Sequence, residues 1–351
     1  MTTIAVLGAG CSGLAAAHVL QDAGWQVTLF EKSRDVGGRA ATRSREGFIY
    51  DHGAQYIKPG APASISWITG RFRTPDLIDI EKPVWVFNGQ GEIQEGDAEQ
   101  NAEEKWTYRS GLATLAKQMA RGLDIHLETR IDHIRKTPQG WWLTPEHGAE
   151  QGPFSRLLIT FPLPQAQELL EKSQLEPGLQ GAIVAQLGAA TYRPLLSIML
   201  GYRPMPQRRP YYALVNIDKA HPISWLAWEH EKAQERVPSG AGLLIAQMAP
   251  DYSREQWERE DSELVRESAA MVAQLVQEEG LATPIFSDVQ RWRYALPDQK
   301  ADSEQLHALT LPAGLAFCGD GFVGGRVHRA LEHGIQVAQQ LLYPKSSRVH
   351  Q

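Results

Sequence analysis

The sequence predicts an α/β protein in which a Rossmann-type dinucleotide-binding domain carries an inserted substrate domain of antiparallel sheet and helix. Three observations predict this architecture. The chain begins with a strand, a glycine-rich turn and a helix, and it ends with a second strand–glycine–helix unit. Several alternating strands and a charged helix lie between them, as in a separate antiparallel layer. The 351 residues are enough for two domains.

The first unit is a buried strand over residues 4–7, followed at once by Gly8-Ala9-Gly10-Cys11-Ser12-Gly13. Gly8 allows the tight turn, Gly10 lets a pyrophosphate approach the backbone, and Gly13 lets the next helix pack against the strand. We expect that helix from residue 14 to about residue 23. Its N–H groups and partial positive charge favour phosphate, so the turn indicates a dinucleotide site.

A second strand, over residues 26–30, ends in Glu31. This carboxylate can accept hydrogen bonds from both ribose hydroxyls and disfavours a 2′-phosphate, which argues against an NADP-type ligand in this position. The turn Gly37-Gly38-Arg39 follows. The two glycine signatures and the acid predict a dinucleotide site. The C-terminal strand–glycine–helix unit indicates which dinucleotide binds.

That C-terminal unit is a strand over residues 315–318, then Gly319-Asp320, then Gly324-Gly325-Arg326-Val327 and a helix from about residue 328 to 342. The Asp320 carboxylate can accept from a ribityl hydroxyl or lie near a pyrophosphate. The helix N–H groups could face the electron-rich N1/O2 edge of a flavin and stabilise negative charge there. The predicted dinucleotide is therefore FAD.

The intervening elements follow from alternation and turn residues. We expect a hairpin over 84–93, a helix from 112 capped by Gly122, an alternating strand over 125–131 that continues as a hairpin through 141–143, and a strand over 156–160. Further strands are expected over 194–201, 224–228, 242–249 and 289–296, with a helix over 254–279. The predicted FAD-binding domain is 1–57, 105–164 and 286–345, the substrate domain 58–104 and 165–285, and the tail 346–351.

Composition excludes several classes of function. A net charge of −6 gives no electrostatic footprint for nucleic acid or an acidic membrane, and no apolar run reaches the roughly 18 residues of a spanning helix. The N-terminus lacks a basic region before the first strand, and only two cysteines occur, so we expect a cytoplasmic protein without disulfides. No His-Glu-X-X-His, Cys-X-X-Cys or Gly-X-Ser-X-Gly pattern predicts a metal site or a serine hydrolase.

With these motifs together, the sequence resembles the FAD-dependent amine oxidase superfamily, and within it renalase and its bacterial relatives. The most specific segments are Asp51-X-Gly53-Ala54-Gln55-Tyr56, Arg291-Trp292-X-Tyr294-Ala295-X-Pro297, Cys318-Gly319-Asp320 and Gly325-Arg326-Val327. The resemblance implies a p-hydroxybenzoate-hydroxylase-like fold with non-covalent FAD. It also implies oxidation of 2- or 6-dihydroNAD(P) isomers, with O2 as the final acceptor and hydrogen peroxide as product.

Carried over position by position, the resemblance implies a set of cofactor-binding residues: Gly8, Gly10, Cys11, Ser12, Gly13, Glu31, Lys32, Gly38, Arg39, Ile131, Gly319, Asp320, Arg326 and Val327. No catalytic acid–base pair is assigned, because hydride transfer needs alignment of a C–H bond rather than a proton acceptor. Candidate residues of the substrate pocket are Gln55, Tyr56, Trp225, Trp228, Gln247 and Tyr294. Each of them could equally be a packing residue.

Two departures from the bacterial renalases concern the substrate. Residues 228–233 are acidic where relatives have a Ser-Lys-Pro stretch, and Gln247 stands where relatives place a histidine. An amine oxidase or another flavin dehydrogenase is therefore an alternative, with Trp228, Glu229 and Tyr294 as a cage for a cation. A third possibility is a low-turnover flavin-binding or sensing protein. The substrate, the natural acceptor and the oligomeric state are left open by the sequence.

Overall fold

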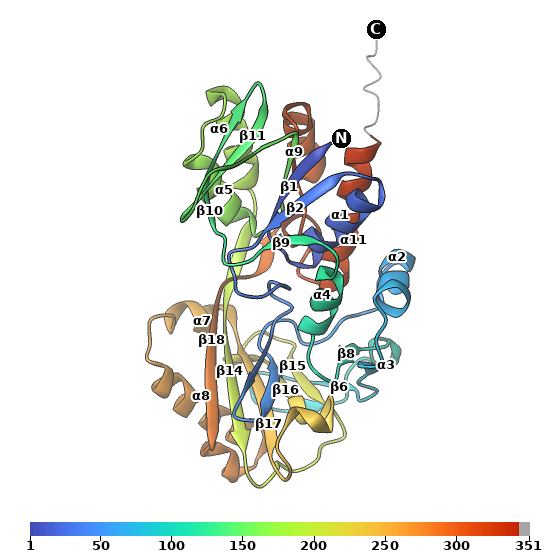
Figure 1. Ribbon diagram of the computed structural model, residues 1–351. Coiled ribbons are helices and arrows are strands. Elements are labelled where there is room, and N and C mark those ends of the chain that lie inside the picture. The colour runs from blue at the N-terminus through green and yellow to red at the C-terminus, as the bar shows by residue number, and fades with distance from the viewer. Residues whose placement is uncertain (344–351) are drawn as a thin grey trace.

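Two sheets organise the computed structural model, which describes residues 1–343 (Figure 1). The first is a five-stranded parallel sheet of order β19-β13-β1-β2-β9. Its strands are β1 (Thr3–Leu7), β2 (Gln26–Phe30), β9 (Asp124–His126), β13 (Arg156–Ile159) and β19 (Leu315–Phe317). Segments from both ends of the chain therefore lie in one sheet, on either side of β13, as the N- and C-terminal glycine motifs predict.

Helices cover both faces of this parallel sheet. One face packs on α1 (Cys11–Asp22), α4 (Ala113–Ala120) and α11 (Val327–Leu342), with Ile4 and Val6 among the buried residues. The other face packs on α5 (Leu163–Glu171), α6 (Pro177–Leu187) and α9 (Ser303–Thr310), with Ala5 and Leu7 buried. A three-stranded sheet of β10 (Ile131–Thr137), β11 (Gly140–Pro145) and β12 (Gln151–Phe154) closes this second layer. The doubly wound arrangement is the predicted Rossmann-type fold.

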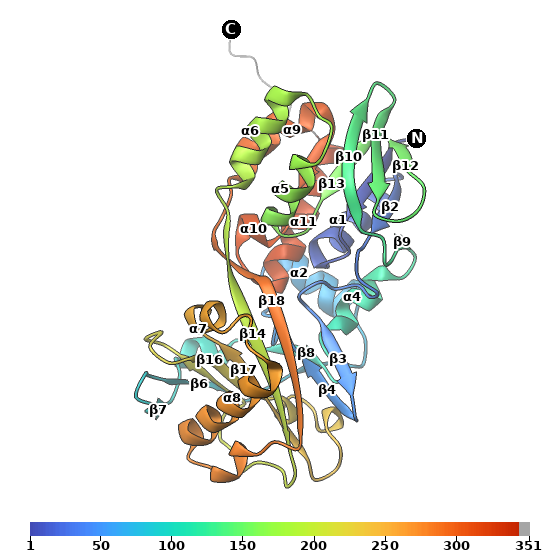
Figure 2. The ribbon, with the colours of Figure 1, turned by 90° about the vertical axis from the view of Figure 1, so that its left-hand side faces the viewer.

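The second sheet has seven strands in the order β18-β14-β17-β16-β15-β6-β7. Its strands are β6 (Val84–Phe87), β7 (Ile93–Gln94), β14 (Thr191–Tyr202), β15 (Ala213–Asn216), β16 (Ile223–Trp228), β17 (Gly242–Met248) and β18 (Phe286–Gln299). Figure 2 shows β14 and β18 running side by side from the region of the parallel sheet into this sheet. These two strands connect the region of the parallel sheet with the seven-stranded sheet.

The two faces of the seven-stranded sheet bury different partners. Leu226, Trp228 and Leu244 face α8 (Asp261–Val276), whereas Ala227 and Ile245 face β4 (Phe48–Asp51). Alternate residues of each strand point to opposite faces, so Trp225 and Gln247 share the face that looks toward the FAD-binding motifs. This face supplies the candidate substrate wall.

The remaining elements are short and mostly connect the two layers. They are β3 (Thr42–Arg45), β5 (Leu77–Asp79), β8 (Trp106–Tyr108), α2 (Pro62–Ser66), η1 (Trp67–Arg71), α3 (Ala98–Ala102), η2 (Glu229–Glu231), η3 (Gln234–Arg236), α7 (Pro250–Glu255), η4 (Glu279–Ala282), η5 (Leu311–Ala313) and α10 (Asp320–Val323). No helix in residues 1–343 is both long enough and apolar enough to cross a bilayer.

Two element predictions need correction. The strand expected over 125–131 is split, because Glu128 has φ +51° and residues 128–129 bond to the backbone of Ser33 and Glu31 instead. The helix expected over 254–279 is also split into α7 and α8. The Arg291 guanidinium accounts for the break, since it donates to the carbonyl oxygens of Trp257 at 2.9 Å and Arg259 at 2.5 Å.

The two sheets, with the helices that pack on them, divide the chain at other residues than the predicted domain boundaries. Helices α5 and α6 fall in the predicted substrate segment yet pack on the parallel sheet, because their apolar residues bury against Leu157 and Ile159. Strand β18 falls in the predicted cofactor segment yet pairs along β14, from Thr191 opposite Gln299 to Gly201 opposite Phe286. The predicted tail, 346–351, lies outside the described residues.

Candidate functional site

The predicted glycine signatures meet at the start of α1. Gly10 forms an isolated bridge with Gly37, and Gly8 has φ +105°. A Cβ at Gly13 would lie 2.2 Å from the Gly8 carbonyl oxygen, so only glycine allows this helix–strand approach. A Cβ at Gly10, by contrast, would meet no protein atom within 4 Å. Gly10 therefore borders open space beside a helix N-terminus, where a pyrophosphate fits.

Glu31 lies at the end of β2 beside this turn. Its buried carboxylate accepts from Ala9 N–H at 2.8 Å and from Ser33 N–H at 2.9 Å, so both flanking turns hold it in place. A groove beside Glu31 is lined by further predicted residues, namely Gly8, Lys32 and Ile131. Burial lowers the pKa of Lys32, with Glu31 opposing that shift. The groove has the acid and the apolar walls that an adenosine requires.

Arg39 and Asp320 connect the two ends of the chain. Their side chains form an ion pair at 2.6 Å, and Arg39 also donates to the Tyr294 carbonyl oxygen at 2.9 Å. The Tyr192 hydroxyl donates to Asp320 at 3.3 Å. Gly319, with φ +135°, turns the chain into α10, and its N–H donates to His333 Nδ1 at 3.1 Å. Sequence reasoning missed Tyr192 and His333, which carry no motif.

The two cysteines lie near this turn and are fully inside the fold. Burial raises the pKa of Cys11 to about 11 and that of Cys318 to about 12, so both are neutral thiols at neutral pH. Ser12 lies at the contact of α1 with α11, where a Cβ on Gly334 would meet the Ser12 carbonyl oxygen at 2.1 Å. The turn thus provides close packing rather than thiol chemistry.

Residues 51–56 run between the cofactor turn and the seven-stranded sheet. Ala54 N–H donates to the Arg39 carbonyl oxygen at 2.9 Å, and a Cβ at Gly53 would lie 2.1 Å from that same oxygen. From the sheet, Gln247 Nε2 donates to the Gly53 carbonyl oxygen at 2.6 Å, and Trp292 Nε1 donates to that of His52 at 2.7 Å. This segment is therefore fixed from both sides.

Three aromatic rings gather beside the segment. The rings of Tyr56 and Trp225 stack with centroids 6.2 Å apart, and Tyr212 lies 6.0 Å from Trp225 and 6.4 Å from Tyr56. Within residues 1–343, the Tyr212 hydroxyl and Trp225 Nε1 are buried without a hydrogen-bond partner. We call these three residues the aromatic wall. Tyr212 was missed, since it precedes β15 without any periodic pattern.

The structure does not bring all candidate pocket residues together. Trp228 is fully buried on the opposite face of the sheet, against Tyr211. Tyr294 packs on Tyr192, and its hydroxyl donates to Glu168 at 3.1 Å, at the edge of the adenosine groove. Arg326 is exposed at the N-cap of α11, and Val327 packs on the core beneath it.

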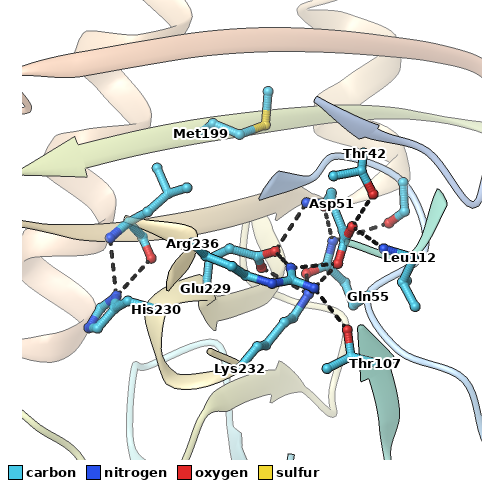
Figure 3. Close-up of polar contacts among 12 residues, drawn as sticks. Thr42, Asp51, Gln55, Thr107, Leu112, Met199, Glu229, His230, Lys232 and Arg236 are labelled. Carbon is cyan, nitrogen blue, oxygen red and sulfur yellow. Dashed lines mark hydrogen bonds and ion pairs between the residues drawn. The ribbon is translucent and has the colours of Figure 1, made fainter. Parts of the chain in front are cut away.

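A buried charge cluster includes Asp51 and contacts Gln55 (Figure 3). It consists of Asp51, Glu229, Lys232 and Arg236, whose side chains are all 0% exposed. Arg236 contacts Asp51 at 2.7 Å and pairs with Glu229, while Lys232 contacts Glu229 at 2.8 Å and Asp51 at 3.3 Å. Formal charges of two acids and two bases cancel.

Neutral groups also hydrogen-bond to the cluster. Asp51 accepts from Thr42 Oγ1 at 2.6 Å and from Leu112 N–H at 2.8 Å, and Arg236 donates to Thr107 Oγ1 at 3.0 Å. Burial alone would raise the pKa of Asp51, but Arg236 and Lys232 outweigh it and hold that pKa well below its usual range. The spacing of Glu229, Lys232 and Arg236 was the available sequence signal, although it does not reveal Asp51 as their partner.

Both layers and the site define the class of protein: a nucleotide-binding oxidoreductase fold whose glycine cradle, ribose acid and C-terminal Gly-Asp turn suit a flavin dinucleotide. The chain belongs to the flavin-containing amine oxidoreductase family. The family's model matches residues 86–342, and a NAD(P)-binding Rossmann-like domain matches residues 6–67. FAD is the cofactor of this FAD-dependent oxidoreductase, and the open space at Gly10 and the acid at Glu31 fit it.

Curated relatives match about a quarter of the chain. The 4,4′-diapophytoene desaturases of Staphylococcus haemolyticus (strain JCSC1435) and Staphylococcus aureus (strain MRSA252) are 38% and 50% identical over 86 residues. Those matches cover 24% of this chain and 17% of each desaturase. The chain therefore spans only a small part of the length of these desaturases.

Solved structures match nearly the whole fold. A candidate protoporphyrinogen oxidase from Exiguobacterium sp. 255-15 has a TM-score of 0.76 at 14% identity, over 97% of this chain and 98% of its own. Putrescine oxidase bound to putrescine gives 0.73 at 15% identity, over 97% and 99%. Reduced UDP-galactopyranose mutase gives 0.77 at 12% identity, over 97% and 94%. At these identities the likeness extends to the fold alone.

Proposed function

We propose that this protein is an oxidase that takes hydride from a small, electrically neutral reduced ring, with 2- and 6-dihydroNAD(P) isomers as its substrates. The carrying observation is the composition of the wall beside residues 53–56. It consists of aromatic rings and the amides of Gln55 and Gln247. A flat dihydropyridine can stack on such a wall, and its C–H bond needs alignment rather than a base.

The arrangement of charges favours this substrate over an amine. Of the three residues that could cage a cation, Trp228 faces the other side of the sheet, Tyr294 is bonded to Glu168, and Glu229 is paired with Arg236 and Lys232. These three side chains therefore do not form a cage for an amine cation. Amine oxidation remains the second candidate, supported by the family itself.

The acidic segment 228–233 is no obstacle to a phosphate-bearing substrate. Glu229 is neutralised inside the charge cluster, and Glu231 pairs with Lys82 at 2.6 Å. Repulsion of a nucleotide is thereby reduced, because each carboxylate has a cation beside it.

Bound FAD supplies the two-electron acceptor. In the proposed balance, dihydroNAD, O2 and one proton give NAD⁺ and hydrogen peroxide. The residues of this chain would bind and orient the two rings and exclude water: Arg39 and Asp320 would hold the cofactor, and the aromatic wall would take the substrate ring.

Anaerobic mixing with 2-dihydroNAD or 6-dihydroNAD tests the proposal. The flavin absorbance near 450 nm (roughly the oxidised flavin band, a property of the cofactor) should bleach within seconds, and admission of O2 should return it with stoichiometric peroxide. A panel of mono- and diamines is the matched comparison. Bleaching by an amine and none by saturating dihydronicotinamides would reverse the order of the two candidates.

A further inference from the structure

The charge cluster reaches one polar residue of the candidate site. Lys232 Nζ donates to Gln55 Oε1 at 3.4 Å, and Gln55 Nε2 donates to the carbonyl oxygens of Asp51 at 2.6 Å and Gly53 at 3.2 Å. These contacts define one orientation of the amide. The flipped amide would place its NH2 group against the ammonium and its oxygen against two carbonyl oxygens, so both ends would repel.

Gln55 lies within a continuous set of contacts between the cofactor turn and the sheet. The Gly53 carbonyl oxygen also accepts from Gln247, and the next N–H, that of Ala54, donates to the Arg39 carbonyl oxygen. Arg39 in turn pairs with Asp320. A change at Gln55 would thus move the backbone that connects the cofactor turn at Arg39 to Tyr56 of the aromatic wall.

Stability alone does not account for Lys232. The Asp51–Arg236 pair, with Thr107 and Leu112, already connects the 229–236 segment to β4 and β8. Burying a second ion pair costs desolvation that its attraction barely repays, so buried pairs are weak evidence for stability. The feature that distinguishes Lys232 is its contact with Gln55.

We propose that Lys232 is a positioning residue: its ammonium fixes the orientation of the Gln55 amide and so holds residues 53–56, which connect the cofactor turn at Arg39 to the aromatic wall. The kinetic part of this inference rests on the proposed function. Its spectroscopic part does not, because it reads the surroundings of the bound flavin without any substrate.

The test compares Lys232→Met with the double variant Glu229→Gln/Lys232→Met, which restores charge balance in the cluster. Lys82→Met is the matched control, since Lys82 pairs with Glu231 in the same segment at 33% side-chain exposure. The readouts on each holoenzyme are the visible spectrum of bound FAD, the rate of O2 reoxidation after photoreduction, and KM and kcat with 6-dihydroNAD.

We expect the double variant to fold, to show an altered flavin band and at least a threefold change in reoxidation rate, and to raise KM about tenfold with kcat within threefold. A tenfold rise in KM corresponds to about 1.4 kcal/mol, which is the free energy of one hydrogen bond that helps to position the substrate. Lys82→Met should match the wild type in its flavin spectrum and reoxidation rate. A wild-type spectrum, reoxidation rate and KM in the double variant would overturn the proposal and leave Lys232 as a charge-balancing residue.

A second variant keeps the inference testable if the Lys232 variants do not fold. Gln55→Met leaves all four charges in place and must reproduce the altered band and reoxidation rate; a wild-type result there refutes the proposal. If wild-type enzyme is not reduced by any dihydronicotinamide, the proposed function fails, while the spectra and reoxidation rates still decide the role of Lys232.

Discussion

Alanine substitutions at two glycines of the N-terminal turn can distinguish a glycine needed for protein packing from a glycine needed for cofactor binding. Gly10 has φ −75° and ψ 173°, a conformation open to alanine, and its Cβ would meet no protein atom within 4 Å. In Gly10→Ala, restricting the unfolded chain gains about 0.4–1 kcal/mol, and a poorer N-cap loses a similar amount. We therefore expect the free energy of unfolding of the apoprotein to change by less than about 1 kcal/mol.

The same methyl group would occupy the space where the pyrophosphate meets the backbone. Overpacking of that kind costs about 1–3 kcal/mol, which corresponds to a loss of FAD affinity of about 5- to 150-fold. Gly13→Ala is the matched contrast, because its Cβ would lie 2.2 Å from the Gly8 carbonyl oxygen and so strains the protein itself. It should lower the stability of the apoprotein by about 1–3 kcal/mol.

Thermal unfolding of the two apoproteins and fluorescence titration with FAD measure both quantities. The expected pattern is an apoprotein of near-wild-type stability with weakened FAD binding for Gly10→Ala, and a destabilised apoprotein for Gly13→Ala. Normal FAD affinity in Gly10→Ala, or equal destabilisation in both variants, would refute the assignment of Gly10 to the cofactor and Gly13 to packing.

Three further predictions follow from individual contacts. Glu31→Gln weakens the acceptor for two backbone N–H groups and for the ribose, and should reduce FAD affinity about tenfold in a fluorescence titration; an unchanged Kd would place the ribose elsewhere. Burial, with His307 nearby, lowers the pKa of His333 from 6.5 to about 4, so the unfolded chain binds the proton more tightly and stability falls as pH drops from about 6.5 toward 4. This amounts to about 2 kcal/mol between pH 7 and pH 5 in urea unfolding, and His333→Gln should flatten that slope; an identical slope would assign the loss to other groups. Trp225→Phe should raise KM with stability nearly unchanged, whereas the core substitution Trp228→Phe should lower Tm and leave KM alone; the reverse pattern would mean that the wrong face of β16 meets the substrate.

Local sequence signals predicted the cofactor side well because each one depends on a few adjacent residues. The strand, glycine turn and helix at residues 3–22, the acid at Glu31 and the strand and Gly-Asp turn at 315–320 all lie where the motifs place them. Element ends were harder. Glu128 adopts a left-handed conformation, and the side chain of Arg291 interrupts the helix expected over 254–279. Both causes are distant contacts with no local pattern.

The sequence by itself determined the parallel nucleotide-binding fold, the family and the FAD cofactor, because backbone turns, helix dipoles and strand periodicity are local properties. Only the tertiary structure decided which side chains share the substrate face. Sheet alternation turns Trp225 toward Tyr56 and Trp228 to the opposite face, and packing from a distant strand brings Asp51 to Lys232 and Arg236. Glu229 of the acidic segment therefore belongs to a buried cluster whose formal charges cancel, since charge balance in a protein interior depends on partners that are remote in sequence.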